Sequence, residues 1–126
     1  MTLADRLASL AATRGVRRCA VASLEGFVID AATSETGGEA TGSDDAIAGL
    51  VAAALASGRS LADLFGDGEL RQVTIEYEDG PVLLVPLPDP AAEHVVLAVL
   101  EDAGSLGRAR LAVRRSLHEL AKAVAE

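Results

Sequence analysis

The chain has 126 residues, a formal net charge of -8 and only three aromatic residues, Phe27, Phe65 and Tyr77. An electrostatic field of this sign repels phosphate backbones and anionic membrane surfaces, so we expect neither a nucleic-acid partner nor a membrane partner. Cys19 is the only cysteine. It excludes an intrachain disulfide and multi-cysteine zinc sites, and it is typical of a reducing cytoplasm, which is the location we expect.

The first part of the chain predicts a helix followed by a β-hairpin. Leucines recur at helical spacing over 3–13, and Thr2 with Asp5 has the pattern of a capping box at the start of that helix. Two apolar stretches, 16–23 and 27–31, then predict strands joined by a tight turn. We expect this hairpin to be antiparallel, because the turn is too short for a crossover.

The middle of the chain predicts a loop, a helix and a short packed segment. Residues 32–42 include three glycines and no large apolar residue, which is typical of a loose loop. Ser43 is placed to cap the next helix, and Gly58 supplies a stop signal for it. Residues 59–68 hold one small apolar cluster, which predicts a helical turn or a packed loop.

The last part of the chain predicts three strands and a helix. Polar and apolar residues alternate over 73–77, whereas 82–87 and 94–100 are unbroken apolar runs of the kind found in central strands. From 105 to the C-terminus the spacing is helical again. The order is therefore α-β-β-α-β-β-β-α, which predicts a single α+β domain over 1–126 with a five-stranded antiparallel sheet and helices on its faces.

The predicted central helix has no charged residue between Ala46 and Gly58. A helix that covers a sheet in a monomer should present a polar face to water, so a second copy of the chain across a two-fold axis is the expected cover. The alternative is a small exposed Ala-rich surface, since alanine is a good helix former. Small residues line the side opposite the large apolar ones: Gly49, Ala53 and Ala56.

Short motifs in a fixed order resemble the roadblock/dynein light chain family, and together they cover nearly the whole chain. They are Gly15-Val16, the hairpin Ser23-Leu24-Glu25-Gly26-Phe27-Val28-Ile29, Val73-Thr74-Ile75-Glu76 with Gly80 before Leu83-Leu84-Val85, and Leu97-Ala98-Val99-Leu100 followed by Leu106-Gly107. The chain departs from the family pattern at residues 86–90 and in the 32–42 loop.

The resemblance implies a roadblock/profilin-like fold and a dimer in which the second helix and third strand pair with their copies. The partner copy is identical in a homodimer and is another roadblock chain in a heterodimer. Family members regulate or scaffold Ras-like small GTPases, and the bacterial gliding-motility type stimulates GTP hydrolysis by its partner. Carried onto this sequence, the interface comprises Ile47, Gly49, Leu50, Ala53, Ala56, Arg71, Val73 and Ile75.

The residues suggest no catalytic, cofactor or metal site, so we expect a protein that is not an enzyme. His94 and His118 lack a second ligand at metal spacing, and Cys19 is expected to be a buried, inert thiol. Gly37 and Gly42 have the outer spacing of a phosphate-binding loop, but Ser43 replaces its lysine and Asp44 would repel phosphate. A small-ligand sensor on a similar sheet is the alternative function, and it predicts a sizeable internal pocket.

Four arginines lie close together in the last predicted helix. They are a candidate docking patch for an acidic partner, and the alternative is a solvated face with helical ion pairs to residues such as Glu119. The cluster comprises Arg108, Arg110, Arg114 and Arg115.

Overall fold

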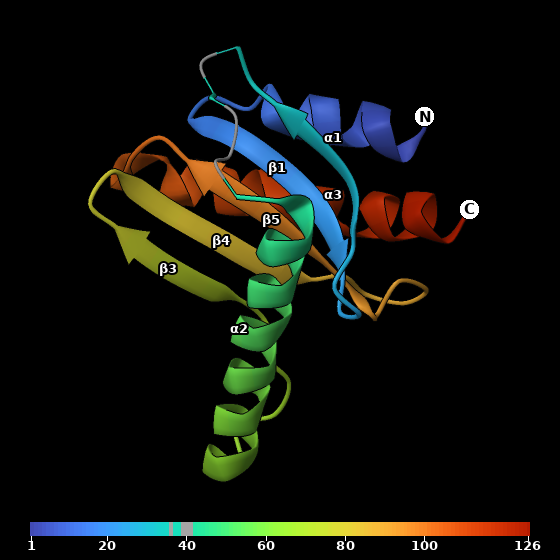
Figure 1. The fold of residues 1–126 in the computed structure, drawn as a ribbon, viewed down its shortest axis with the longest axis vertical. Helices are drawn as coiled ribbons and strands as arrows, with labels where there is room; N and C mark the ends of the chain where they lie inside the picture. Colours follow the sequence, from blue (N-terminus) through green and yellow to red (C-terminus); the bar gives the residue numbers. More distant parts are fainter. Residues whose placement is uncertain (36, 39–41) are drawn as a thin grey trace.

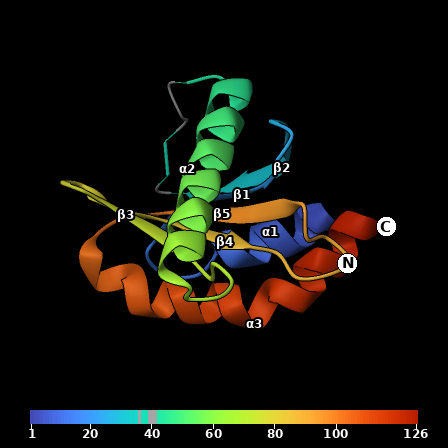
Figure 2. The same ribbon diagram turned by 90° about the horizontal axis from the view of Figure 1, so that it is seen from below.

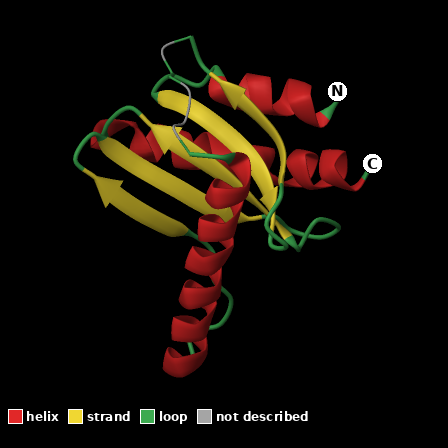
Figure 3. Cartoon of the chain, in the orientation of Figure 1, coloured by secondary structure: helices red, strands yellow, loops and turns green. Residues whose placement is uncertain are grey.

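Five antiparallel strands form one sheet with helices on both faces, as the computed structural model shows for residues 1–35, 37, 38 and 42–126 (Figure 1). The strands are β1 (Val16–Ser23), β2 (Val28–Thr33), β3 (Val73–Tyr77), β4 (Gly80–Pro86) and β5 (His94–Leu100). The helices are α1 (Leu3–Ala11), α2 (Asp44–Phe65), α3 (Leu106–Ala125) and a 3-10 turn, η1 (Ala103–Ser105). Figure 3 shows how the strands and helices follow one another along the chain. The predicted element order and fold class are confirmed.

The strand order is β2-β1-β5-β4-β3, so the N-terminal hairpin lies next to the last strand. Cys19 of β1 faces Ala98 of β5 in the antiparallel register. The predicted bounds of β1, β3 and β5 agree with the structure, whereas β2 continues to Thr33 because its last residue still pairs with Arg18. Residues 32 and 33 are therefore strand and not loop. Positions 36 and 39–41 of the predicted loop lie outside the described residues.

Alternating side chains of the central strands supply two separate cores. In β4, Leu83 and Val85 enter the core on one face of the sheet, and Leu84 enters the core on the other face. In β5, Val96 and Val95 divide in the same way. Successive side chains in a strand point to opposite faces, which is why an unbroken apolar run fits a strand covered on both sides.

Helices α1 and α3 cover one face of the sheet, and α2 covers the other (Figure 2). The predicted capping box of α1 is present: Asp5 N–H donates to Thr2 Oγ1 at 3.2 Å, and Thr2 N–H donates to the Asp5 carboxylate at 3.0 Å. Arg6 Nη2 lies 2.9 Å from Glu119 Oε2, which links α1 to α3. Among the described residues, α2 is the only helix on its side of the sheet.

The prediction that the second helix ends at Gly58 is wrong, because α2 continues to Phe65. Gly58 lies inside the helix, where a Cβ would come within 3.0 Å of the Leu70 side chain. The glycine allows this close approach and does not form a turn. The helix ends instead at Gly66, which adopts a left-handed conformation (φ 69°) and donates its N–H to the Ala62 carbonyl at 2.9 Å.

Candidate functional site: the exposed side of α2 and the β3 edge

Helix α2 rests on the sheet by its first half and extends beyond it with its second half (Figure 1). Its start is fixed by Ser43, whose hydroxyl accepts the Ala46 N–H at 3.1 Å. The buried residues of α2, Ala48, Val51 and Leu55, all fall within its first twelve residues. The last ten residues therefore have few sheet residues beneath them.

Large apolar side chains remain exposed along α2. Leu50 is 72% exposed, and near the end of the helix Leu64 and Phe65 are 81% and 71% exposed. Leu61 is also exposed. A group of large apolar residues on one side of a monomer's helix commonly marks an interaction site. By length and composition alone α2 could also cross a membrane, but one such helix is weak evidence, and this one packs on a sheet.

A shallow apolar groove runs between α2 and the sheet, with a volume of about 320 Å³. Ile47, Leu50 and Ala54 line its helix side, and Ile75, Tyr77 and Val82 are among the strand residues that line the other side. Leu50 and Tyr77 are both mostly exposed, so the groove opens to the surface beside β3. At its far end Arg18 Nη2 lies 3.9 Å from Asp44 Oδ1.

Strand β3 forms the sheet edge next to this groove. On one side it pairs with β4, where Ile75 faces Val82 and Val73 faces Leu84. Among the residues the structure describes, no strand pairs with its other side. An unpaired edge presents a row of backbone donors and acceptors that can extend the sheet into another chain.

The structure does not bring all of the predicted interface residues to one place. Ile47, Leu50 and Ile75 line the groove, while Val73 is half-buried in the core beneath α2. Arg71 is exposed just before β3. The small residues Gly49, Ala53 and Ala56 are exposed and do not line the groove.

Sequence reasoning missed the apolar end of α2 and Tyr77. The sequence pattern predicts a helical turn or a packed loop for the segment that holds Leu61, Leu64 and Phe65, because Gly58 has the character of a helix stop. Their spacing continues that of Ile47 and Leu50 at intervals of three and four residues, which is the signal that could have revealed a longer helix.

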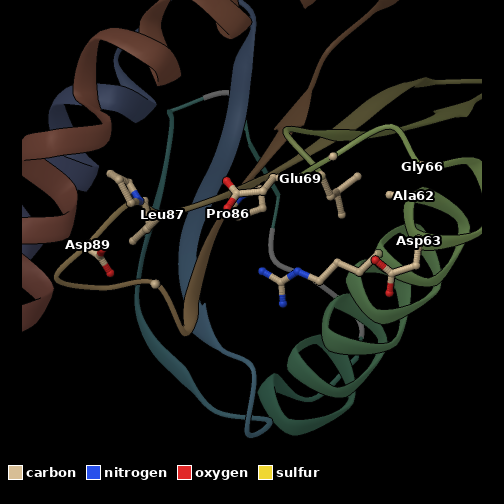
Figure 4. Close-up of a pocket in the computed structure, with 12 residues that line it drawn as sticks. Ala62, Asp63, Gly66, Glu69, Pro86, Leu87 and Asp89 are labelled. Atoms are coloured by element: carbon tan, nitrogen blue, oxygen red, sulfur yellow. The ribbon is translucent and has the colours of Figure 1, made fainter.

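A second, larger hollow of about 920 Å³ lies between the end of α2, the segment that follows it and the β4–β5 connection (Figure 4). Its charged lining comprises Arg59, Asp63, Glu69 and Asp89, and its apolar lining includes Leu70 and Leu87. One cation among three carboxylates gives this hollow an acidic character.

The four arginines of the predicted cluster lie on α3, on the other side of the sheet from α2 (Figure 2). All four are exposed. Arg108 Nη1 donates to the Arg14 carbonyl and Arg114 Nη2 donates to Gln72 Oε1, both at 3.3 Å. Glu119, the expected helical partner of the cluster, pairs instead with Arg6.

The nucleophilic and metal-binding side chains of the described residues do not gather at one place. Cys19 is buried, its thiol donates to the Leu7 carbonyl at 3.2 Å, and burial raises the pKa of this thiol to about 12. The prediction that Cys19 is buried is confirmed. Within residues 1–35, 37, 38 and 42–126, no group of three or more His, Cys, Asp or Glu residues could hold a metal ion. The prediction that residues 37–44 do not form a phosphate-binding loop concerns a segment that includes residues 39–41, which lie outside the described residues.

Comparison with solved structures identifies the same fold in MglB proteins. A structure of MglB with tetrameric arrangement has a TM-score of 0.85 at 20% identity, covering 96% of this chain and 86% of that one. The gliding protein MglB from Thermus thermophilus has a TM-score of 0.84 at 20% identity, covering 96% and 87%. A Roadblock/LC7 domain from Streptomyces avermitilis has a TM-score of 0.71 at 21% identity, covering 95% and 98%.

At this level of identity the likeness establishes a shared fold and no more. No curated protein matches the chain. The family model of the Roadblock/LC7 domain, however, matches residues 3–101, which is most of the sequence. The resemblance stated from the sequence motifs is confirmed, and the chain belongs to the Roadblock/LC7 domain family.

Proposed function

We propose that two copies of this chain pair through the exposed side of α2 and the β3 edge, and that the pair is a non-catalytic regulator or scaffold of a Ras-like small GTPase. Its place of action would be the cytoplasm. Family membership supports the regulator role, because the roadblock resemblance implies it. The likeness in fold to the gliding protein MglB supports the bacterial, GTPase-activating form of that role.

The observation that carries the pairing is the combination of exposed apolar helix surface and open sheet edge on one side of the molecule. Covering a large apolar side chain such as Leu50 is worth about 1.5–3 kcal/mol relative to leaving it exposed. Pairing of β3 with the β3 strand of the second copy would at the same time give hydrogen-bond partners to the unpaired backbone groups of this edge. Because a two-fold axis brings each surface against itself, one patch serves both protomers.

The predicted residues fit this arrangement in two ways. Leu50 and Ile75, beside the groove, would supply the apolar part of the contact. A Cβ added to Gly49 would meet no neighbouring group within 4 Å, so this surface is open to close approach by another helix. A homodimer is the simplest pair, and a second roadblock chain in place of the copy would use the same surface.

The GTPase role is tested with the Ras-like small GTPases of the same cell. Purified protein is mixed with each GTPase loaded with GDP or a non-hydrolysable GTP analogue, and complexes are detected by size-exclusion chromatography. Phosphate release is then measured under single-turnover conditions with and without the protein. We expect a complex in at least one nucleotide state. Absence of binding in every nucleotide state would remove this function.

The apolar groove also favours a second candidate function, a small-ligand sensor. Its volume lies at the lower end of the range for small-molecule sites. The dye 8-anilinonaphthalene-1-sulfonate distinguishes the two functions. A sensor should bind the dye in its native assembly and gain thermal stability with dye concentration. A dimer that covers the groove should bind the dye only when dilution separates the copies.

A further inference from the structure

Positive charge is concentrated in α3 although the chain is acidic. Of the 11 basic and 19 acidic residues, α3 contains five basic residues and a single acidic one, Glu119. The remainder of the chain therefore has 6 basic and 18 acidic residues. The family model ends at residue 101, before α3 begins, so this charge pattern lies outside the segment by which the family is identified.

The five cations lie on the exposed side of the helix and form what we call the α3 basic face: Arg108, Arg110, Arg114, Arg115 and Lys122. In the part of the chain that the structure describes, no carboxylate lies within 4.0 Å of any of them. The hydrogen bonds of Arg108 and Arg114 go to neutral oxygens, which leave their charges uncompensated. Leu111 is 49% exposed on the same helix.

We propose that the α3 basic face binds an acidic segment of a partner protein, in which several Asp or Glu residues accompany one apolar side chain. Guanidinium groups pair well with carboxylates, since their fixed donors match both carboxylate oxygens. Leu111 offers an apolar contact among the arginines. The proposal does not rest on the dimer or the GTPase, because α2 and α3 lie on opposite faces of the sheet (Figure 2).

The size of the face favours a short protein segment over a membrane or a nucleic acid. A 20-residue helix is about 30 Å long. Glu101 and Asp102 precede this helix, and Glu126 follows it. At physiological salt, interactions between exposed charges are largely screened beyond about 8 Å. A segment that stays on the helix meets mainly positive charge, whereas an extended polyanion also meets the acidic surroundings.

The test uses a fluorescent peptide of about 12 residues, composed of Glu, Ala and one Leu, which is long enough to follow the helix when extended. Its counterpart with Gln in place of Glu is the peptide control. Binding is measured by fluorescence anisotropy at two salt concentrations. Arg115→Glu is compared with Arg59→Glu, which makes the same change in net charge at another exposed helical arginine.

We expect the Glu peptide to bind and the Gln peptide not to bind. Arg115→Glu should weaken the affinity at least about fivefold, whereas Arg59→Glu should change it less than about twofold. Backbone amide NMR shifts of the unmodified protein should move in α3, which tests the site even if a variant is unstable. Equal weakening by both variants, or shifts outside α3, would overturn the proposal. Binding to phosphatidylserine vesicles without binding to the peptide would also overturn the proposal, and would identify an anionic membrane surface as the ligand of the α3 basic face.

Discussion

Gly15 lies directly against the side chain of Ser105, where the turn before β1 meets the start of α3. A Cβ added to Gly15 would overlap Oγ and Cβ of Ser105. The Gly15 carbonyl also accepts the Glu101 N–H at 2.9 Å. Ser105 is buried, and its hydroxyl donates to Asp102 Oδ1 at 2.9 Å. The small size of Gly15 and Ser105 thus allows the turn before β1 to pack against the start of α3.

Gly15→Ala should destabilise the fold by about 2–4 kcal/mol, because the new methyl group meets Ser105 and because the backbone there has φ of 92°. Gly26→Ala is the matched control. Gly26 has a similar φ of 103° but no atom within 4 Å of a Cβ, so only the backbone penalty of about 1 kcal/mol applies. Urea unfolding measures both variants, and equal losses would show that the Ser105 contact is unimportant.

Two leucines of α2 should respond very differently to truncation. Leu55 is completely buried against the sheet, so Leu55→Ala should cost about 2–5 kcal/mol of unfolding free energy. Leu64 is mostly exposed beyond the sheet, and Leu64→Ala should cost less than about 0.5 kcal/mol in the isolated chain. Chemical denaturation at low protein concentration measures both. A large loss for Leu64→Ala would mean that another chain covers the end of α2.

The fold could be predicted largely from local patterns, because its strands and helices have clear periodicity and short connections. Strand order could not be derived in the same way. The pairing of β1 with β5 joins residues far apart in the sequence, such as Cys19 and Ala98, and no local pattern encodes it. The sequence pattern predicts too early an end for α2, because Gly58 has the character of a helix stop. In the structure Gly58 lies inside the helix beside the Leu70 side chain, and no local pattern shows that contact.

The candidate site could be predicted only in part. An uncharged helix indicated that α2 needs a cover, and Leu50 and Ile75 do meet at one groove. The sequence could not show which side of the helix faces β3, since that depends on how α2 crosses the sheet. Gly49 and Ala56 consequently lie on the outward side, and Tyr77 beside the groove was not foreseen.

The proposed pairing surface predicts a specific change in mass. Leu50→Glu places a charge beside the apolar groove, and a buried unpaired charge costs several kcal/mol, so the dimer should dissociate. Leu111→Glu is the control, because Leu111 is also an exposed helical leucine but lies on α3. Multi-angle light scattering should give a monomer for the first variant and a dimer for the second. A parent protein that is monomeric, or a Leu50→Glu protein of parental mass, would contradict the surface.

The buried Cys19 thiol predicts a loss of stability at high pH. Burial raises the pKa of this thiol from its ordinary 9.0 to about 12 in the folded protein. Between these values the unfolded chain releases the proton while the folded chain keeps it. The unfolded state then binds fewer protons, and the free energy of unfolding falls as pH rises from about 9 to about 12.

Cys19→Ala isolates this effect from other groups that titrate at high pH. The variant is expected to be less stable near neutral pH, because it removes a buried sulfur atom that packs between the sheet and α1. Its stability should nevertheless fall less steeply than that of the parent protein between about pH 9 and the highest pH at which unfolding stays reversible. Urea unfolding at a series of pH values measures both slopes. Parallel slopes would mean that the thiol ionises as readily in the folded protein as in the unfolded chain.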